Sequence, residues 1–495
     1  MTGTQGRPVT ARDAPAGRRW PEVRAFALAA AAALAGCTLA PASEPARRDM
    51  TGLGTALPPA RTFGPPPARP VAGSEAGLAA DFLDLAFRME SGRPVPALSR
   101  FEGPVRVRTA GTVPPLAEAD LARLIGRLRS EAGIDIARAA DGVADGVADG
   151  AADGRANLTV EFLPRRTISA LVPQAACFVA PNVGSWAEYR RARRTGRTDW
   201  TGLRVRERIA VFIPGDVAPQ EVRDCLNEEI AQGLGPLNDL YRLPESVFND
   251  DNVQGVLTAF DMLMLRVYYA PEIFSGMTEA QAAAVVPSVL ARLGYTPGGS
   301  GGAALRETPR AYVAAVETAL GPRASAESRR SAAMRAVAIA DARGWRDSRA
   351  GFAWFVLGRL SISGRPDVAL DAFLRADAIF RSGRGMELQA ANVSVQLAAF
   401  ALSQGDAEQA LTLTGQAAGA AMRGQNAALL FTLLTIRAEA LDILGRTAEA
   451  ASARTEALGW GRYGLGTAAE ITTRASEIAA LSPARRAATL RTLSQ

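Results

Sequence analysis

The feature that most constrains the fold of this chain is a spacing of small residues that recurs in its C-terminal part. Glycine is followed by alanine five and twelve residues later in three places. The three sets are Gly364, Ala369 and Ala376, then Gly405, Ala410 and Ala417, then Gly445, Ala450 and Ala457. Glycine permits a tight turn between helices, and alanine lets paired helices approach closely. The spacing therefore predicts stacked helix pairs over residues 303–495.

This region resembles the tetratricopeptide family. The residues that carry the resemblance are Trp354, Leu357, Gly358, Ala369, Phe373 and Ala376. The period of about 40 residues exceeds the usual period of about 34 residues. The resemblance implies a stack whose concave surface takes a peptide or protein partner. The alternative is a plain helical bundle.

The N-terminus has the order of an export segment. Arg18, Arg19 and Arg24 precede a short apolar run at 26–34, which is too short to span a bilayer stably. The run ends in Leu-Ala-Gly-Cys37, which resembles the lipobox of bacterial lipoproteins. The resemblance implies a signal peptide over 1–37, diacylglycerol on Cys37, and a membrane-anchored protein that faces the periplasm or the cell surface. A buried core cysteine, or a cytoplasmic protein, is the alternative.

Residues 38–77 are rich in proline, alanine, glycine and serine, which predicts a semi-rigid tether. If Cys37 carries lipid, only Cys177 and Cys225 remain, one pair for an oxidising compartment. We expect a disulfide between them, which would contribute roughly 4 kcal/mol through loop closure. Two buried free thiols are the alternative.

Residues 78–295 mix helical and strand patterns, which predicts an α+β domain. Helical spacing occurs at 78–89 and 121–128, and strand patterns occur at 104–108, 157–163, 176–180 and 208–213. An Asp-Gly repeat at 140–154 has too little apolar surface to fold, so we expect a disordered loop. The glycine-rich residues 296–302 predict a linker to the helical region.

The chain contains no histidine, which excludes Ser-His, Cys-His and His-metal catalysis. The arginine-rich residues 189–197 suit anionic lipid or polymer, although a solvated surface loop is the simpler interpretation. No nucleic-acid motif accompanies these arginines, and we expect no nucleic-acid partner.

A helix is predicted from Pro219, which suits a helix start, to the residue before Gly235. Its buried side is formed by residues one turn apart, which are Val222, Leu226, Ile230 and Leu234. Glu228 and Gln232 are also one turn apart, so their polar ends can converge on one point. Gly235 allows the chain to reverse out of the helix.

The spacing of Glu228, Glu229, Gln232, Gly235 and Asn238 resembles the metzincin peptidase pattern H-E-x-x-H-x-x-G-x-x-H. All three ligand histidines of that pattern are replaced, and only the glutamate and the glycine remain. The resemblance implies a zincin-like domain. It also implies a methionine turn, for which Met262 and Met264 are the candidates.

The stretch 228–252 also resembles a bacterial family, the domain of unknown function 2927, some members of which are regarded as lipoproteins. The residues that carry this resemblance include Asn238-Asp239 and the segment 246–251. It covers residues 78–295 and implies no established activity.

Three hypotheses follow for this motif. In the first, the scaffold serves binding without catalysis, and Glu228, Glu229, Gln232 and Asn238 form a polar cleft or a hydrogen-bonded core. In the second, oxygens of Glu228, Gln232 and Asn238 or Asp239 hold a divalent metal, and Glu229 is the general base of a hydrolase. Oxygen ligands favour calcium, magnesium or manganese over zinc. In the third, the acids only cap turns and helices.

Residues 249–252 precede a long apolar helix, so we expect them to cap it, with calcium binding as the alternative. We favour the first hypothesis for the chain as a whole. It predicts an α+β zincin-like domain and an all-α tetratricopeptide-like domain in a cell-envelope lipoprotein. We expect no cofactor, a membrane contact through the lipid anchor, and an envelope protein or peptide as partner of the helical repeats.

Overall fold

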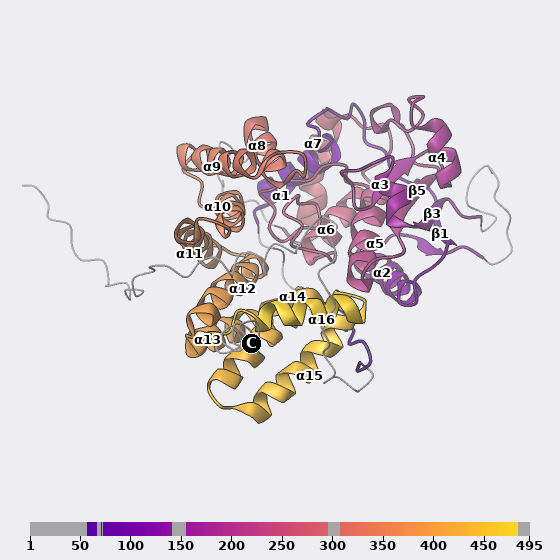
Figure 1. The fold of residues 1–495 in the computed structure, drawn as a ribbon. Helices are drawn as coiled ribbons and strands as arrows, with labels where there is room; N and C mark the ends of the chain where they lie inside the picture. The colour runs from indigo at the N-terminus through magenta and orange to yellow at the C-terminus, as the bar shows by residue number, and fades with distance from the viewer. Residues whose placement is uncertain (1–56, 67–70, 72, 141–154, 296–306, 484–495) are drawn as a thin grey trace, which may run out of the picture.

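A computed structural model describes residues 57–66, 71, 73–140, 155–295 and 307–483 (Figure 1). The expected signal peptide with Cys37, the Asp-Gly repeat after position 140 and the glycine-rich linker lie outside these residues. No helix in the described ranges is both long and apolar enough to cross a membrane.

The first region contains a five-stranded mixed sheet with the strand order β2-β1-β3-β5-β4. The strands are β1 Val105–Gly111, β2 Ile136–Arg138, β3 Leu158–Leu163, β4 Phe178–Pro181 and β5 Ile209–Pro214. Strands β2, β1, β3 and β5 are parallel, and the edge strand β4 pairs antiparallel with β5. The mixed helix and strand prediction is confirmed, but helices connect the parallel strands, so the arrangement is α/β rather than α+β.

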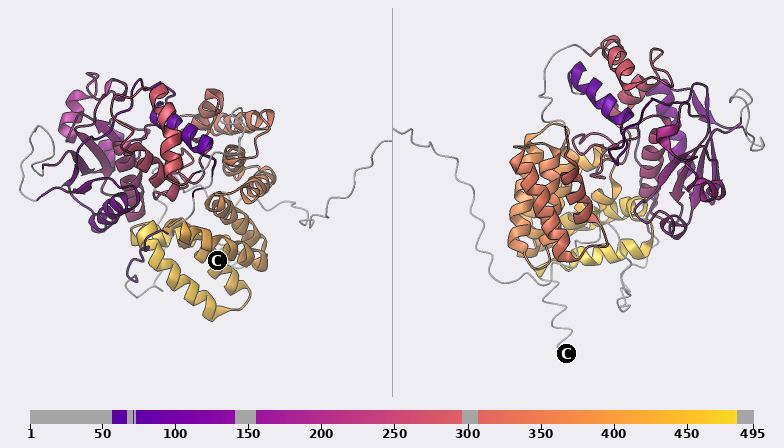
Figure 2. Two further views of the ribbon diagram at one scale, coloured as in Figure 1. Left: turned by 180° about the vertical axis from the view of Figure 1, so that it is seen from behind. Right: turned by 90° about the horizontal axis from the view of Figure 1, so that it is seen from above.

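Helices cover both faces of the sheet (Figures 1 and 2). The helices of this first region are α1 Glu75–Ala86, α2 Ala117–Glu131, α3 Arg165–Ser169, α4 Trp186–Ala192, α5 Pro219–Leu234, α6 Ala259–Tyr268 and α7 Glu279–Arg292. Ile209, Val211 and Ile213 of β5 point into the larger core with α2 and α5, whereas Phe212 points into a smaller core with α3 and α4. This alternation places α5 directly against the central part of the sheet.

The second region is wholly helical among the described residues. Its helices are α8 Arg310–Leu320, α9 Ala326–Ala342, α10 Ser348–Ser361, α11 Pro366–Ser382, α12 Glu387–Gln404, α13 Ala407–Arg423, α14 Ala427–Ile443, α15 Thr447–Gly464 and α16 Ala468–Ala479. Gly364, Gly405 and Gly445 lie between paired helices with φ of 93°, 83° and 73°, a left-handed conformation that favours glycine. The alanines five and twelve residues after each of them are buried. The predicted helix pairs are therefore confirmed.

The starts of alternate helices in this second region touch the first region. The contacts run from Ser348 Oγ to the Tyr241 carbonyl (2.6 Å), from Gln389 Nε2 to the Pro244 carbonyl (2.8 Å), and from the Ala427 amide to Gln220 Oε1 (2.7 Å). They belong to α10, α12 and α14, one for each helix pair. We call this row of contacts the seam. Part of the surface of the helical region is thus used within the molecule.

Part of the expected tether lies against helix α15. The Phe63 ring stacks on Trp460 at 4.6 Å between centroids, and it also contacts Tyr463 and the Arg223 guanidinium. The Arg61 amide donates to the Gly459 carbonyl at 2.9 Å. We call residues 57–66 the strap, because they join α15 to the start of α5.

Candidate functional site

Helix α5 forms as its sequence predicts, directly after β5. Val222, Leu226, Ile230 and Leu234 are all buried against the sheet and its helices. The helix ends at Leu234, and Gly235 follows with φ of −161°, an extended value that any residue adopts. Glycine is required there for space, because a Cβ atom would lie 2.9 Å from the Tyr268 ring.

A fully buried arginine, Arg206, holds the C-terminal end of α5. Its two terminal nitrogens each donate at 2.5 Å, one to the Gln232 carbonyl and one to the Gly235 carbonyl. The last carbonyls of a helix have no partner within the helix and carry negative partial charge, which a guanidinium satisfies. No sequence pattern marks Arg206 for this role, since it lies in one of several arginine-rich segments.

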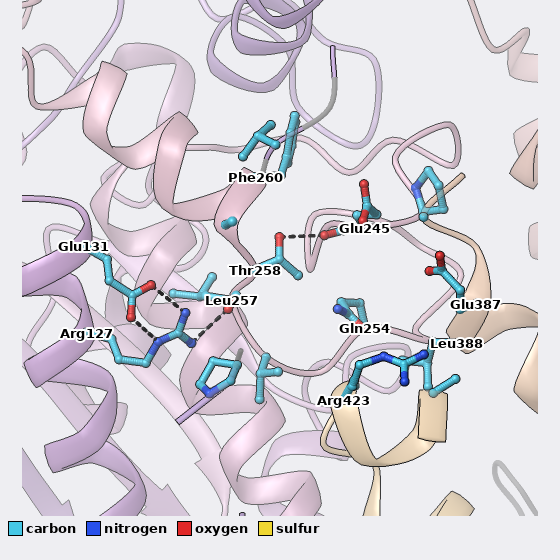
Figure 3. A pocket seen from close by; sticks show the side chains of 18 residues that line it. Arg127, Glu131, Glu245, Gln254, Leu257, Thr258, Phe260, Glu387, Leu388 and Arg423 are labelled. Atoms are coloured by element: carbon cyan, nitrogen blue, oxygen red, sulfur yellow. Dashed lines mark hydrogen bonds and ion pairs between the residues drawn. The ribbon is translucent and has the colours of Figure 1, made fainter. Parts of the chain in front are cut away.

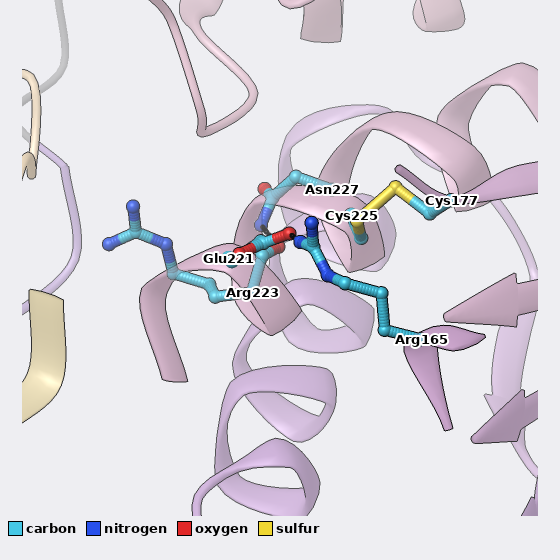
Figure 4. The surroundings of a disulfide bond; sticks show 6 residues. All are labelled: Arg165, Cys177, Glu221, Arg223, Cys225 and Asn227. Carbon is cyan, nitrogen blue, oxygen red and sulfur yellow. Dashed lines mark hydrogen bonds and ion pairs between the residues drawn. A yellow bond between two sulfur atoms is a disulfide. The ribbon is translucent and has the colours of Figure 1, made fainter. Parts of the chain in front are cut away.

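The expected disulfide is present between Cys177 and Cys225, with 6.0 Å between the Cα atoms (Figure 4). It links α5 to the residue just before β4. Arg165 and Glu221 form an ion pair beside it. The motif helix is thus attached to the edge of the sheet near its start and clamped by Arg206 at its end.

The motif residues Glu228, Glu229 and Gln232 lie on the same half of α5. Glu229 is only 5% exposed, and its Oε2 is buried without a hydrogen-bond partner among the described residues. Glu228 is half-buried, and its carboxyl forms no hydrogen bond or ion pair within the described ranges. The Gln232 amide nitrogen lies 3.5 Å from Asp239 Oδ2.

The two residues after the helix behave differently from each other. The Asn238 amide nitrogen donates to the Asp84 carbonyl of α1 at 2.9 Å, so Asn238 joins α5 to α1. Asp239 instead faces the motif, and its Oδ1 is buried without a donor in the part of the chain that the structure describes. The motif therefore contributes Glu228, Glu229, Gln232 and Asp239 to one place, without Asn238.

Two further carboxyl groups complete this place. Glu90, from the loop after α1, interacts with the Asp239 carboxyl, and Asp250 interacts electrostatically with both Glu90 and Glu228. We call Glu90, Glu228, Glu229, Asp239 and Asp250 the acidic cluster. Asp250 belongs to the run 249–252 that the sequence singles out, whereas Glu90 is a single acid in a loop and carries no pattern.

Burial and mutual repulsion favour the protonated forms of these groups. Burial, reinforced by Glu90 and Asp250, raises the pKa of Glu228 to about 8. Burial, with Glu228 as its neighbour, raises the pKa of Glu229 well above its usual value. The same cause, with Glu90 as the nearest carboxyl, raises the pKa of Asp239.

A divalent metal held by Glu228, Gln232, Asn238 and Asp239 does not fit this arrangement. Asn238 is bound to α1, and the Gln232 side chain presents its amide nitrogen to Asp239. Within the described ranges, no three acidic or cysteine side chains converge closely enough to hold a metal ion.

The loop from Pro244 to Thr258 is fixed by its own polar side chains. Asp261, which is fully buried, accepts from the Ser246 hydroxyl (2.6 Å) and from the Thr258 amide (2.8 Å). Asp251 accepts from the Val253 amide and from Gln389 of α12. The N-cap of α6 is Thr258, so the prediction that residues 249–252 cap this helix is wrong. They lie too far before it and close turns within the loop instead.

The predicted methionine turn is not a turn. Met262 and Met264 lie inside α6, and both are buried in the larger core. The arginine-rich segment 189–197 covers the end of α4 and the following turn, where Arg190, Arg191, Arg194 and Arg197 are exposed.

A crevice of about 140 Å³ separates the loop from α12 and α13 (Figure 3). Arg127 and Glu131 form an ion pair on its α2 side, and Glu387, Leu388 and Arg423 line the opposite side. The crevice lies beside the seam and is formed by both regions.

Comparison with known proteins gave one family. No curated protein and no solved structure matches the chain. Residues 75–288 match the model of the family described as Protein of unknown function (DUF2927). The matched part contains the whole sheet, α5 and the acidic cluster, and it ends before α8. The match confirms the resemblance expected from residues 228–252 and supports that family for this part of the chain.

Proposed function

We propose that the chain is a non-catalytic cell-envelope lipoprotein that acts as a binding or scaffold protein. Its sheet region would be a zincin-like fold without histidine, kept for binding. The observation that carries this proposal is the position of the motif side chains in the structure. Asn238 is used to join two helices, and the remaining oxygens do not converge on a metal position.

The electrostatics of α5 support the same conclusion. A general base must be deprotonated at the working pH and within reach of its substrate. Burial and the Glu228 carboxyl raise the pKa of Glu229 well above its usual value. Its side chain is also only 5% exposed. These features suit a hydrogen-bonded binding surface better than a hydrolytic site.

The helical region would act as a tetratricopeptide-like scaffold. One of its edges carries the seam, and helix starts place positive partial charge near the acidic loop residues Glu245 and Asp251. The groove between α11, α12 and α13 is lined by small residues together with Arg381 and Arg423. We propose that an envelope protein or peptide binds to this part of the helical region.

The location rests on the N-terminal sequence. The order of charged and apolar residues before Cys37 is typical of an exported lipoprotein. A disulfide between Cys177 and Cys225 suits an oxidising compartment. Labelling with a lipid precursor should mark the full chain but not Cys37→Ala. An unlabelled wild-type product would argue for a cytoplasmic protein instead.

The non-catalytic part of the proposal is tested by metal analysis. The purified full chain and its Glu228→Ala variant are dialysed against buffer that contains traces of divalent metal. Neither should then contain stoichiometric divalent metal. Stoichiometric metal in the wild type that is lost in the variant would replace this proposal by the alternative, a metal-dependent hydrolase with oxygen ligands.

A further inference from the structure

We propose that the acidic cluster binds an organic cation, a ligand that carries an ammonium or guanidinium group. The inference rests on the proposed binding function of this region and names the chemistry of its ligand. It depends on three properties of the five carboxyl groups: their charge, the lack of hydrogen-bond donors to two of their oxygens in the described part of the chain, and their accessibility.

No arginine forms an ion pair with a carboxyl group of the cluster among the described residues, although arginine is abundant in the chain. Nearby, Arg242 pairs with Asp81 at 2.7 Å and with Asp84 at 2.8 Å. Arg310 donates to the Glu90 backbone carbonyl at 2.9 Å and interacts electrostatically with Asp250, but it forms no ion pair with a cluster carboxyl among the described residues. Neighbouring acids are thus neutralised, while the most buried carboxyl groups are left to repel one another.

Two oxygens of the cluster lack the donors that buried oxygens require. Glu229 Oε2 and Asp239 Oδ1 are both buried without a hydrogen-bond partner in the described part of the chain. An unpaired buried polar group costs free energy, so native structures leave few of them. Glu229 and Asp239 face the same cluster, since each interacts electrostatically with Glu90 and Glu228. A ligand that brings N–H donors would supply both the charge and the hydrogen bonds.

The arrangement of the acidic side chains favours an organic cation over a metal ion. A metal needs several oxygens within about 2.0–2.6 Å of one point. No three acidic side chains in the described ranges meet that requirement. Ammonium and guanidinium groups carry three and five N–H donors in different directions and donate to oxygens at about 2.7–3.1 Å. They can therefore reach carboxyl groups that a single ion cannot bridge.

The cluster opens to solvent on the side of Glu90. Glu90 is exposed, Glu228, Asp239 and Asp250 are half-buried, and Glu229 is the most deeply buried of the five. A cationic group can thus enter past Glu90 and contact Glu228 and Asp239 without unfolding of the helix.

Calorimetric titration of the purified full chain tests the proposal. The probes are 1,4-diaminobutane for a free amine, N-acetyl-L-argininamide for a basic peptide side chain, and uncharged 1,4-butanediol. The variants are Glu228→Gln and Asp239→Asn, which keep the shape of each side chain. Glu408→Gln, at an exposed position on α13, is the matched control.

At least one cationic probe should bind saturably to the wild type, and butanediol should not. Each cluster variant should weaken binding about tenfold or more, and Glu408→Gln should leave it unchanged. The proposal is overturned if neither cationic probe binds the wild type, if butanediol binds equally well, or if both cluster variants bind as the wild type does. Any of those results would leave lipid labelling and metal analysis, and hence the proposed lipoprotein function, untouched.

Discussion

Single residues decide how the motif helix is held. The disulfide partners were predictable because counting cysteines left one pair, and the glutamates were predictable from their spacing on α5. Arg206 was not, since its role depends on a fold that brings residues 206 and 232–235 together. Glu90 was missed for the same reason, because only tertiary contact joins it to Asp239.

Replacing Arg206 by methionine should destabilise the protein strongly. The substitution removes the donors to the Gln232 and Gly235 carbonyls, which would remain buried. We expect a loss of roughly 2–4 kcal/mol in the free energy of unfolding, measured by urea titration. Arg194→Met, at an exposed position, should change it little. Equal stability of the two variants would contradict the clamp.

The acidic cluster should make stability depend on pH in a defined direction. Burial raises the pKa of Glu228 from 4.5 to about 8, so the folded state binds a proton that the unfolded state releases. The stability that this bound proton contributes to the folded state is complete below about pH 4.5 and is lost as the pH rises towards 8. The melting temperature of Glu228→Gln should therefore fall less steeply with rising pH than that of the wild type. At pH 9 the variant should have the higher melting temperature. Parallel melting curves against pH would argue against this.

At the scale of elements, the sequence predicts what depends on local periodicity. The strand patterns at 157–163 and 208–213 correspond to β3 and β5, and the glycine spacing corresponds to the turns of α10–α15. Strand β2 was missed because its three residues are too few for an alternating pattern. The cap of α6 was misplaced because Thr258 competes with four earlier polar residues that look equally suitable.

The glycine after α5 should be sensitive to any side chain. Gly235→Ala brings a Cβ atom to 2.9 Å from the Tyr268 ring, which must shift within a packed core. We expect a loss of roughly 1–3 kcal/mol in the free energy of unfolding. Gly126→Ala, inside α2 with no atom within 4 Å of the new Cβ, should instead stabilise by up to about 1 kcal/mol. Thermal unfolding of both variants gives the comparison, and a neutral Gly235→Ala would show that the ring moves freely.

At the scale of the whole molecule, the arrangement of the two regions could not be predicted from the sequence. Both were recognisable separately, but the seam joins residues more than a hundred positions apart through side chains such as Gln220 and Gln389. No periodic pattern marks these residues. The strap was also unexpected, since proline-rich composition predicts extension and says nothing of where Phe63 binds.

Removing Gln220 should loosen the seam without unfolding either region. Its Oε1 accepts from the Ala427 amide at 2.7 Å and the Ala428 amide at 3.1 Å, which caps α14 from the other region. Gln220→Ala should cost about 1–2 kcal/mol and speed hydrogen exchange at these two amides. Gln416→Ala, exposed on α13, serves as control. Unchanged exchange at Ala427 and Ala428 would mean that the cap comes from elsewhere.

The strap gives the molecule a particular response to force. A pull on the chain from the N-terminal side reaches Phe63 before it reaches α1 or the sheet, because Trp460, Tyr463 and Arg223 surround that ring. The load then passes into α15 and the start of α5, on the two sides of the seam. Tension would act first on the contacts between the two regions. The acidic cluster, on the far half of α5, would bear no load until those contacts break.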